Sequence, residues 1–346
     1  LLRMSDAEAR TLVMAAMMVL VGIAFKLSAV PFHFWCPDAF EGAPAEVAGF
    51  LSVASKGAAF ALLIRFALAL VGDNAATLAE VHLYLGIGIG VIAAVSATFG
   101  NLAAYAQTNI KRLLAYSTIA HAGYMLMAVS ALLILLGGGA EAGLSSEEIH
   151  YSAARCLEGL LYYLAVYLFM NLGAFAIVAL IRNEIYSEEL DDYAGLGRQN
   201  WLLCVCMGVC LISLIGIPPL GGFFAKWIVF YSLFQAGYVH NFAWALLVIG
   251  GLNTVISLFY YVRVLRLMFL EPRPAHARRV DIAFWPIGGY VLLVTLPVIG
   301  LGIFVDPLSN TAQNVAVDTL ATTGGSPQAE GSEEPDVPKL ASERDQ

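Results

Sequence analysis

Long apolar stretches dominate this chain, and short polar stretches separate them. Each apolar stretch has about 20 residues or more, the length that an α-helix needs to cross the hydrocarbon of a bilayer. None shows the alternating ten-residue pattern of a membrane β-barrel, so helices are expected. The pattern predicts an all-α, multi-pass membrane protein with about eight transmembrane helices, at residues 11–34, 44–70, 81–105, 112–136, 155–181, 201–236, 241–268 and 284–305.

Composition indicates the same environment. Of the 346 residues, 60% are hydrophobic and 13% are charged, whereas a soluble domain has about 45–50% apolar residues. The solvent is therefore expected to be a lipid bilayer. The net charge of −8 indicates no acidic binding face, because six acids stand against two bases after about residue 325. We expect residues 306–346 to form a disordered acidic tail.

The basic residues predict how the chain is oriented. On one side of the predicted helices lie Lys111, Arg112, Arg182, Arg198, Arg263, Arg266, Arg273, Arg278 and Arg279. On the other side lie Arg3, Arg10, Arg65 and Arg155. By the positive-inside rule, the larger group faces the cytoplasm.

The segment at 201–236 is too long for one straight helix, and its centre reads SLIGIPPLGGFFAKWIVF. Pro218 and Pro219 cannot donate backbone hydrogen bonds, which frees the carbonyls of Leu214 and Ile215. Such carbonyls are tolerated at membrane depth only inside protein or against water. The prolines therefore predict a broken helix of the kind whose half-helix ends face ions in transporters.

Three of the five lysines, Lys26, Lys56 and Lys226, lie inside apolar segments. A lysine near the bilayer centre costs about 2.5–3.5 kcal/mol on insertion scales. Snorkelling or pairing with a structural carboxylate could account for a single lysine, but no acid lies in the middle of a segment. Unpaired ionisable groups at this depth usually line a hydrated ion path. Lys26 lies near Pro31, which predicts a second helix break. Lys226 lies near the break predicted at Pro218 and Pro219.

The other two lysines are expected to need no explanation beyond solvation. Lys111 lies at a segment end and Lys339 in the tail, where solvation is enough. Glu46, Glu80 and Glu158 are also assigned to segment ends.

His121 shares a helical face with Ser117 and Tyr124 through i−4 and i+3 spacing. It could relay protons between the lysines, since histidine exchanges protons near neutral pH. It could equally hydrogen-bond a neighbouring helix. A lysine that alternates between dry and wet surroundings can also take up and release protons.

No motif in the chain indicates a cofactor, a metal or a nucleic acid. The spacing of Cys204, Cys206 and Cys210 does not match a trusted zinc or iron–sulfur pattern. Phosphate loops, dinucleotide fingerprints, haem motifs and nucleophile elbows are absent from the sequence. We therefore expect the chain to bind no cofactor or metal.

Three stretches carry a family resemblance: FKLSAVPFHFWCPDAFEGAPAEVAGFLSVASKGAAF at 25–60, QTNIKRLLAYSTIAHAGYMLM at 107–127 and GIPPLGGFFAKW at 216–227. They resemble the proton-pumping, antiporter-like membrane subunits of respiratory complex I, most of all the N type (subunit 2). The wider family includes subunits of multi-subunit sodium/proton antiporters and of membrane-bound hydrogenases.

The resemblance implies roles for single residues. Lys26 matches the lysine of the first broken helix, Lys56 that of the following helix, and Lys226 the ionisable residue of the second broken helix. His121 matches a histidine seen in many N-type chains. The family has two inverted repeats joined by a water-filled axis. On that basis, 1–70 would end the first repeat, 81–270 would form the second, and 284–305 would be the last helix.

Family members have about fourteen helices, and the eight here correspond to the last eight. The resemblance therefore implies that the first helices, with a glutamate that pairs with the first lysine, would precede Leu1.

The resulting hypothesis is a subunit of a membrane-bound NADH:quinone oxidoreductase, which translocates protons and holds no redox centre. Its expected partners are other membrane-arm subunits and the lipid bilayer, and its expected location is a bacterial plasma membrane. The alternatives are a subunit of a cation/proton antiporter or hydrogenase, and a scaffold that does not pump.

Overall fold

The structure is a computed structural model that describes residues 6–69, 75–274 and 288–323. Within these ranges every named element is a helix, and one isolated bridge joins Asn109 to Glu189. The elements are α1 (Asp6–Leu27), α2 (Trp35–Gly42), α3 (Ala45–Phe50), η1 (Leu51–Ser55), α4 (Lys56–Ala69), α5 (Ala75–Tyr105), α6 (Ile110–Gly138), α7 (Ser146–Ile185), η2 (Leu190–Tyr193), η3 (Leu196–Arg198), α8 (Trp201–Ile215), α9 (Gly221–Gly237), α10 (Asn241–Phe269), α11 (Gly289–Ile303) and α12 (Val305–Thr323). The prediction of an all-α fold is confirmed.

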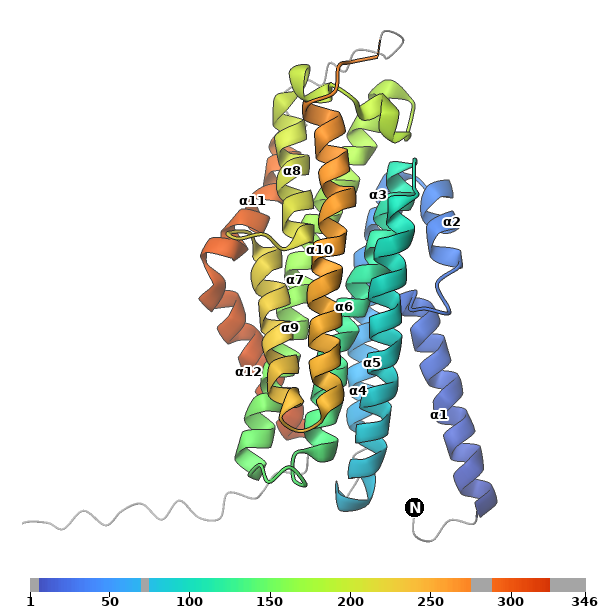
Figure 1. The fold of residues 1–346 in the computed structure, drawn as a ribbon, viewed down its shortest axis with the longest axis vertical. Coiled ribbons are helices and arrows are strands. Elements are labelled where there is room, and N and C mark those ends of the chain that lie inside the picture. Colours follow the sequence, from blue (N-terminus) through green and yellow to red (C-terminus); the bar gives the residue numbers. More distant parts are fainter. Residues whose placement is uncertain (1–5, 70–74, 275–287, 324–346) are drawn as a thin grey trace, which may run out of the picture.

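Helix α6 forms the centre of the bundle. It packs against α2, α5, α7 and α9, and 94% of its most apolar 18-residue stretch is buried. Figure 1 shows the long helices side by side along the long axis, with α1 at one edge, where it packs on α4. Because α6 is buried on all sides, its polar side chains face other helices rather than lipid.

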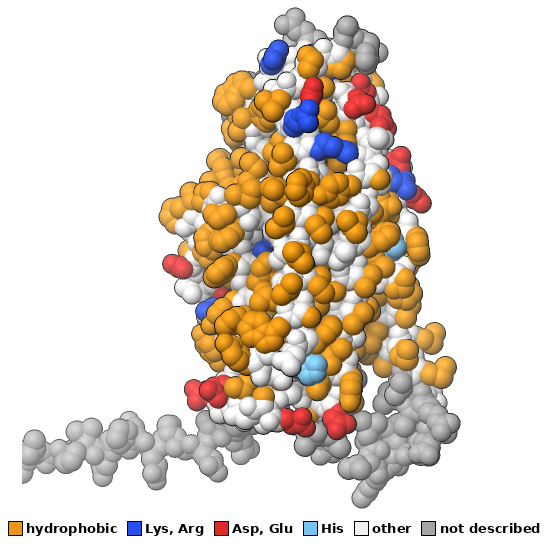
Figure 2. All heavy atoms as spheres, viewed as in Figure 1, with side chains coloured by type: hydrophobic (Ala, Val, Ile, Leu, Met, Phe, Trp, Pro, Cys, Tyr) orange, Lys and Arg blue, Asp and Glu red, His pale blue; other side chains and the backbone are white. Residues whose placement is uncertain are grey.

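The outside of the bundle is apolar. Met18 is 74% exposed and Leu293 is 71% exposed, and apolar side chains cover the middle of the face in Figure 2. On that face most Lys and Arg side chains lie toward the upper end of the view. This distribution suits a chain whose solvent is hydrocarbon.

Among the described residues, five helices are long and apolar enough to cross a membrane. The number rises to as many as seven if each of two bent pairs, Leu190–Arg198 with Trp201–Ile215 and Gly289–Ile303 with Val305–Thr322, is one span. The hydropathy pattern predicted about eight spans, because it does not distinguish a divided helix from a single one. The segment at 11–34 is divided into α1 and α2, and the segment at 201–236 into α8 and α9. Both helix breaks are thus confirmed, whereas the division into repeats at 1–70 and 81–270 stays a prediction.

The expectation that residues 306–346 are a disordered tail is wrong for its first part. Residues Val305–Thr323 form α12, which packs against α7. Ala312, Ala316 and Leu320 are buried and repeat every four residues, which gives this mostly polar helix an apolar stripe. Composition alone does not reveal such a stripe, because it ignores the spacing of the apolar residues. Residues 324–346 lie outside the described part of the chain.

Candidate functional site

Glycine and proline build the break between α8 and α9. Gly216 follows α8 with a φ of +88°, in the left-handed region that favours glycine. Pro218 and Pro219 occupy the connection. At Gly222 an added Cβ would lie 1.8 Å from the carbonyl oxygen of Ser213. The close approach of the two half-helices therefore requires glycine at that position.

Lys226 lies in the second turn of α9 and reaches back across the break. Its ammonium nitrogen donates to the carbonyl oxygen of Ile215 at 2.8 Å and to that of Leu214 at 3.2 Å. In an unbroken helix these oxygens would accept from the residues that are Pro218 and Pro219 here. The prediction that the prolines free these two acceptors is confirmed. The partial negative charge at the end of α8 also favours the ammonium.

Lys226 also contacts the central helix. The side chain is buried, with 3% exposed. Its nitrogen lies 4.5 Å from the centroid of the Tyr124 ring on α6, a distance at which a cation interacts with an aromatic face. Lys226 is therefore held from two sides, by backbone carbonyls of α8 and by an aromatic ring of α6.

Lys56 is the second buried lysine, with 1% exposed. It begins α4 directly after the π-helical turn η1, and π turns inside helices are frequent at functional sites. Its ammonium nitrogen donates to the carbonyl oxygen of Thr118 on α6 at 2.7 Å. The Cys36 thiol on α2 lies close enough to interact with the lysine charge.

His121 is fully enclosed, and both of its ring nitrogens have partners. Nδ1 lies 2.9 Å from the hydroxyl of Tyr163 on α7, and Nε2 lies 3.2 Å from the hydroxyl of Tyr261 on α10. The Tyr261 hydroxyl also hydrogen-bonds Ser117. The imidazole thus joins three helices through hydroxyl groups that can both donate and accept hydrogen bonds.

One face of α6 connects these groups. Thr118, His121 and Tyr124 follow one another at intervals of three residues, so each is a neighbour of the next on the helix surface. Thr118 contacts Lys56 and Tyr124 contacts Lys226, and the centroid of the His121 ring lies 5.9 Å from that of the Tyr124 ring. The structure therefore brings three of the four predicted proton-path residues together.

The fourth, Lys26, lies apart from this cluster. It occupies the last turn of α1, and its side chain is exposed. It lines an open groove between α1 and α4 together with Ala58 and Leu62. Within the described part of the chain it has no hydrogen bond or ion pair. Pro31 lies in the connection between α1 and α2, as predicted.

Tyr163 and Tyr261 were missed at the sequence level. Each is the second residue of a tyrosine pair inside an apolar segment, at 162–163 and 260–261. The pairs were the available signal, because a buried tyrosine hydroxyl needs a partner. Spacing within one helix could not reveal which helix supplies that partner.

The expectation that Lys111 is simply solvated is wrong. Lys111 is 3% exposed, and its nitrogen lies 2.8 Å from a carboxylate oxygen of Glu188. It also donates to the carbonyl oxygen of Ala43 at 2.7 Å. The loop after α7 returns to the start of α6 and covers the lysine, a tertiary contact that segment boundaries cannot predict.

Glu158, which the sequence placed near a segment end, is also buried in the bundle. Its side chain is fully buried and lies 2.7 Å from Arg155, one turn earlier on α7. The Ser309 hydroxyl on α12 donates to its other carboxylate oxygen. Because α12 was not predicted, the sequence offered no reason to bury this carboxylate.

Metal ligands do not converge in the described residues, where no group of three or more His, Cys, Asp or Glu side chains could hold an ion. All five cysteines are free and buried. The expectation that the chain binds no cofactor stays a prediction.

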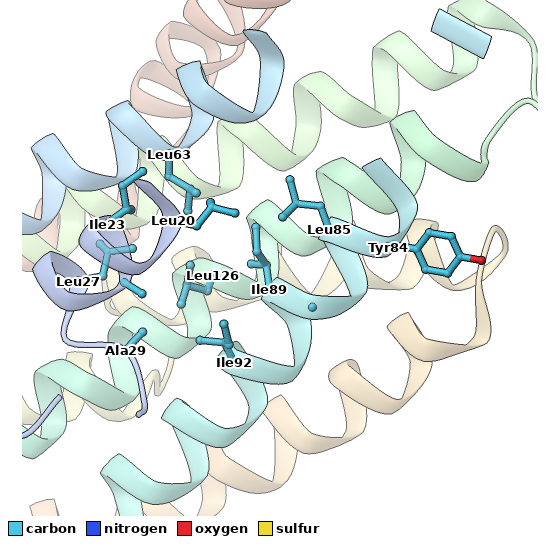
Figure 3. A pocket seen from close by; sticks show the side chains of 12 residues that line it. Leu20, Ile23, Leu27, Ala29, Leu63, Tyr84, Leu85, Ile89, Ile92 and Leu126 are labelled. Carbon is cyan, nitrogen blue, oxygen red and sulfur yellow. The ribbon is translucent and has the colours of Figure 1, made fainter. Parts of the chain in front are cut away.

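A separate cavity of about 230 Å³ lies between α1, α4, α5 and α6. Figure 3 shows Ile23 and Leu27 of α1 on one side, with Ile89 and Ile92 of α5 across from them. Its lining is almost entirely apolar. It contains none of the clustered polar groups and is not a candidate for proton chemistry.

Known proteins with similar sequences include subunits of NADH-quinone oxidoreductases. Subunit N of the NADH-quinone oxidoreductase of an Anaeromyxobacter species is 44% identical over 267 residues, which are 75% of this chain and 48% of that protein. Subunit N of Chlorobium chlorochromatii is 41% identical over 90% of this chain and 57% of its own length. The chain thus spans about half the length of the curated relatives that it matches.

Solved structures agree in fold. A chain of respiratory complex I from Thermus thermophilus, with bound aureothin, has a TM-score of 0.65 and 30% identity, covering 86% of this chain and 58% of that one. A chain of an Mrp complex from a Dietzia species has a TM-score of 0.71 at 18% identity, covering 90% and 60%, which shows a common fold alone. The family profile for the transmembrane part of NADH:quinone oxidoreductase/Mrp antiporter subunits matches residues 2–136 and 148–257. This chain belongs to that family.

Proposed function

We propose that this chain translocates protons across a membrane as a subunit of an NADH:quinone oxidoreductase. The observation that carries the proposal is the burial of Lys56 and Lys226 against Thr118 and Tyr124 of α6, which lie three residues before and three residues after His121. Neither ammonium group has a carboxylate partner among the described residues, and costly intramembrane charges of this kind usually mark ion or proton pathways. The subunit N relatives, at up to 44% identity over long stretches, support membership of the oxidoreductase over membership of an antiporter.

In this proposal the lysines exchange protons and the chain carries no electrons. A proton would pass from Lys56 to His121 and from there to Lys226. The Tyr163 and Tyr261 hydroxyls would hold the imidazole in place. Electron transfer from NADH to quinone would take place in partner subunits of the membrane and peripheral arms. Lys26 would act at the α1–α4 groove, outside this cluster. The proposed location is a bacterial plasma membrane.

The test is proton translocation by the assembled oxidoreductase in vesicles. Lys56→Met and Lys226→Met keep the length and apolar stem of each side chain while removing the titrating group. We expect both variants to assemble and to lower the number of protons moved per electron. An unchanged ratio and turnover in both would refute the proposal.

A further inference from the structure

A surface pocket of about 330 Å³ lies at the C-terminal end of α10, away from the buried lysines and His121. This end of α10 is uppermost in Figure 1. The walls of the pocket come from three parts of the chain: the connection between α5 and α6, the turn η2, and the last turns of α10. Its volume falls within the roughly 300–1,000 Å³ that small-molecule sites occupy.

Backbone hydrogen bonds fix the walls of this pocket to one another. The amide of Leu190 on η2 donates to the carbonyl oxygen of Thr108 at 2.7 Å. The amide of Gly195 donates to the carbonyl oxygen of Leu267 on α10 at 3.0 Å. The shape of the pocket therefore does not depend on exposed side chains, and a ligand would meet a preformed site.

Arg263 supplies a positive charge that is held in place but not neutralised. One of its guanidinium nitrogens donates to the carbonyl oxygen of Tyr105 at 2.8 Å, and the other donates to that of Gln107. Both acceptors are neutral. Within the described residues Arg263 forms no ion pair, so its charge stays available at the pocket wall.

Asp191 supplies a negative charge from a different wall, on η2. Its side chain is exposed, and in the described part of the chain it too forms no ion pair. Arg266 and Glu271 also line the pocket, but they neutralise each other at 3.0 Å. The pocket thus presents one uncompensated cation and one uncompensated anion. Figure 2 shows basic and acidic side chains together near the upper end of the face, above its apolar middle.

An exposed apolar stripe of α10 leads to this pocket. Its members follow one another at alternating intervals of four and three residues, which keeps them on one side of the helix. They are between 44% and 61% exposed: Val248, Leu252, Val255, Phe259 and Val262. Arg263 follows directly after the last of them.

The length of α10 places the pocket at the level of lipid headgroups. Tyr238 and Trp244, with ring centroids 5.7 Å apart, lie at the start of the helix, where such aromatic pairs mark a membrane interface. About 20 helical residues cross the hydrocarbon. Counted from Trp244, they end in the turn that contains Arg263. By the positive-inside rule, this is the cytoplasmic leaflet.

We propose that the pocket binds a phospholipid whose headgroup carries both a phosphate and a primary ammonium, as in phosphatidylethanolamine. The phosphate would lie on Arg263, because a guanidinium matches phosphate geometry. The ammonium would donate to Asp191, and an acyl chain would lie along the apolar stripe. A headgroup with a phosphate alone leaves Asp191 unpaired, and a quaternary ammonium has no N–H group to donate.

Lipid retention tests the site directly. The full chain is purified in detergent and mixed with phosphatidylethanolamine, phosphatidylcholine or phosphatidylglycerol of identical acyl chains. We expect native mass spectrometry to show severalfold more retained phosphatidylethanolamine than either other lipid, and the unfolding midpoint to be highest with it. Equal retention of the three lipids would overturn the proposal. So would an equal rise of the midpoint with soluble phosphoethanolamine, because a lipid site also uses the acyl chains.

Two variants assign the two charges. Asp191→Asn should keep the phosphate contact and lose the preference, so that phosphatidylethanolamine and phosphatidylcholine are retained equally. Arg263→Gln should lower retention of all three lipids severalfold. Glu189→Gln and Arg198→Gln are the controls, because both residues are exposed at the same end of the bundle and do not line the pocket. They should retain lipid like the unchanged chain.

Asp191→Asn keeps the test decisive if Arg263→Gln does not fold, since the Asp191 side chain is exposed. An unchanged preference for phosphatidylethanolamine in Asp191→Asn would overturn the assignment. This inference goes beyond the proposed function, and its readout is bound lipid rather than pumped protons. Loss of the lipid site would therefore leave the proposed function standing, and normal pumping by Lys226→Met would refute only that function.

Discussion

The ammonium nitrogen of Lys226 lies 2.8 Å from the carbonyl oxygen of Ile215, across the break between α8 and α9. The two residues belong to different half-helices, and the contact exists only because Pro219 cannot donate to that oxygen. A proline thus creates the acceptor and a lysine eleven positions after Ile215 occupies it. The lysine can leave this acceptor only if water or another donor takes its place.

Replacement of Lys226 by arginine separates charge from titration. Arginine keeps a cation that can bond the carbonyls of Leu214 and Ile215, but it is not deprotonated in proteins. We therefore expect Lys226→Arg to assemble and to lose most proton translocation. The measurement is proton uptake against electron transfer in vesicles.

Arg266→Lys is the matched control, because Arg266 is 67% exposed at the end of α10. It should leave both rates unchanged. Full pumping by Lys226→Arg would mean that a fixed charge is enough at this position.

The sequence was most informative where one stretch of chain contains both the cause and the consequence. Pro218, Pro219 and Lys226 lie within nine residues, so the break, the freed carbonyls and the lysine could be predicted together. The spacing of Ser117, His121 and Tyr124 likewise placed one polar face on α6.

Contacts between distant segments were not predictable in this way. The partners of His121 come from α7 and α10, and the residues that cover Lys111 come from two different loops. Hydropathy identifies which segments are helices, but it does not give the rotation of each helix about its axis. The role of Glu158 was missed for the same reason, since Ser309 is 151 residues away.

Lys111→Met should destabilise the chain. The substitution leaves Glu188 with Arg182 at 3.4 Å and the Asn109 amide at 3.5 Å, and it removes the donor to Ala43. We expect a loss of about 1–3 kcal/mol, the cost of an unsatisfied buried polar group. Thermal unfolding of the full chain in detergent measures it, and an unchanged midpoint would show that the Glu188 contact contributes nothing.

Glu158→Gln should loosen α12. Glutamine keeps the shape of the side chain but leaves Arg155 without its carboxylate. Breaking a fully buried pair costs about 3–5 kcal/mol, and we expect less here because the Arg155 side chain is 30% exposed.

Limited proteolysis within residues 305–323 checks the expectation for α12. Cleavage should be faster in Glu158→Gln than in the unchanged chain. Ser309→Ala, which removes the hydrogen bond but keeps the ion pair, should have a smaller effect. Equal cleavage in all three would show that α12 is held by its apolar stripe alone.

Gly222→Ala should disrupt the break itself. A Cβ at this position would lie 1.8 Å from the Ser213 carbonyl oxygen, a backbone atom that cannot move without shifting α8. Overpacking typically costs about 1–3 kcal/mol, and we expect this substitution to reach the upper end of that range or exceed it. Because the displaced half-helix carries the acceptors of Lys226, proton translocation should fall together with the unfolding midpoint.

Gly251→Ala on α10 is the control, since nothing lies within 4 Å of its added Cβ, and alanine should stabilise that helix by about 0.5–1 kcal/mol. Equal unfolding midpoints for the two variants would show that the half-helices can separate without cost.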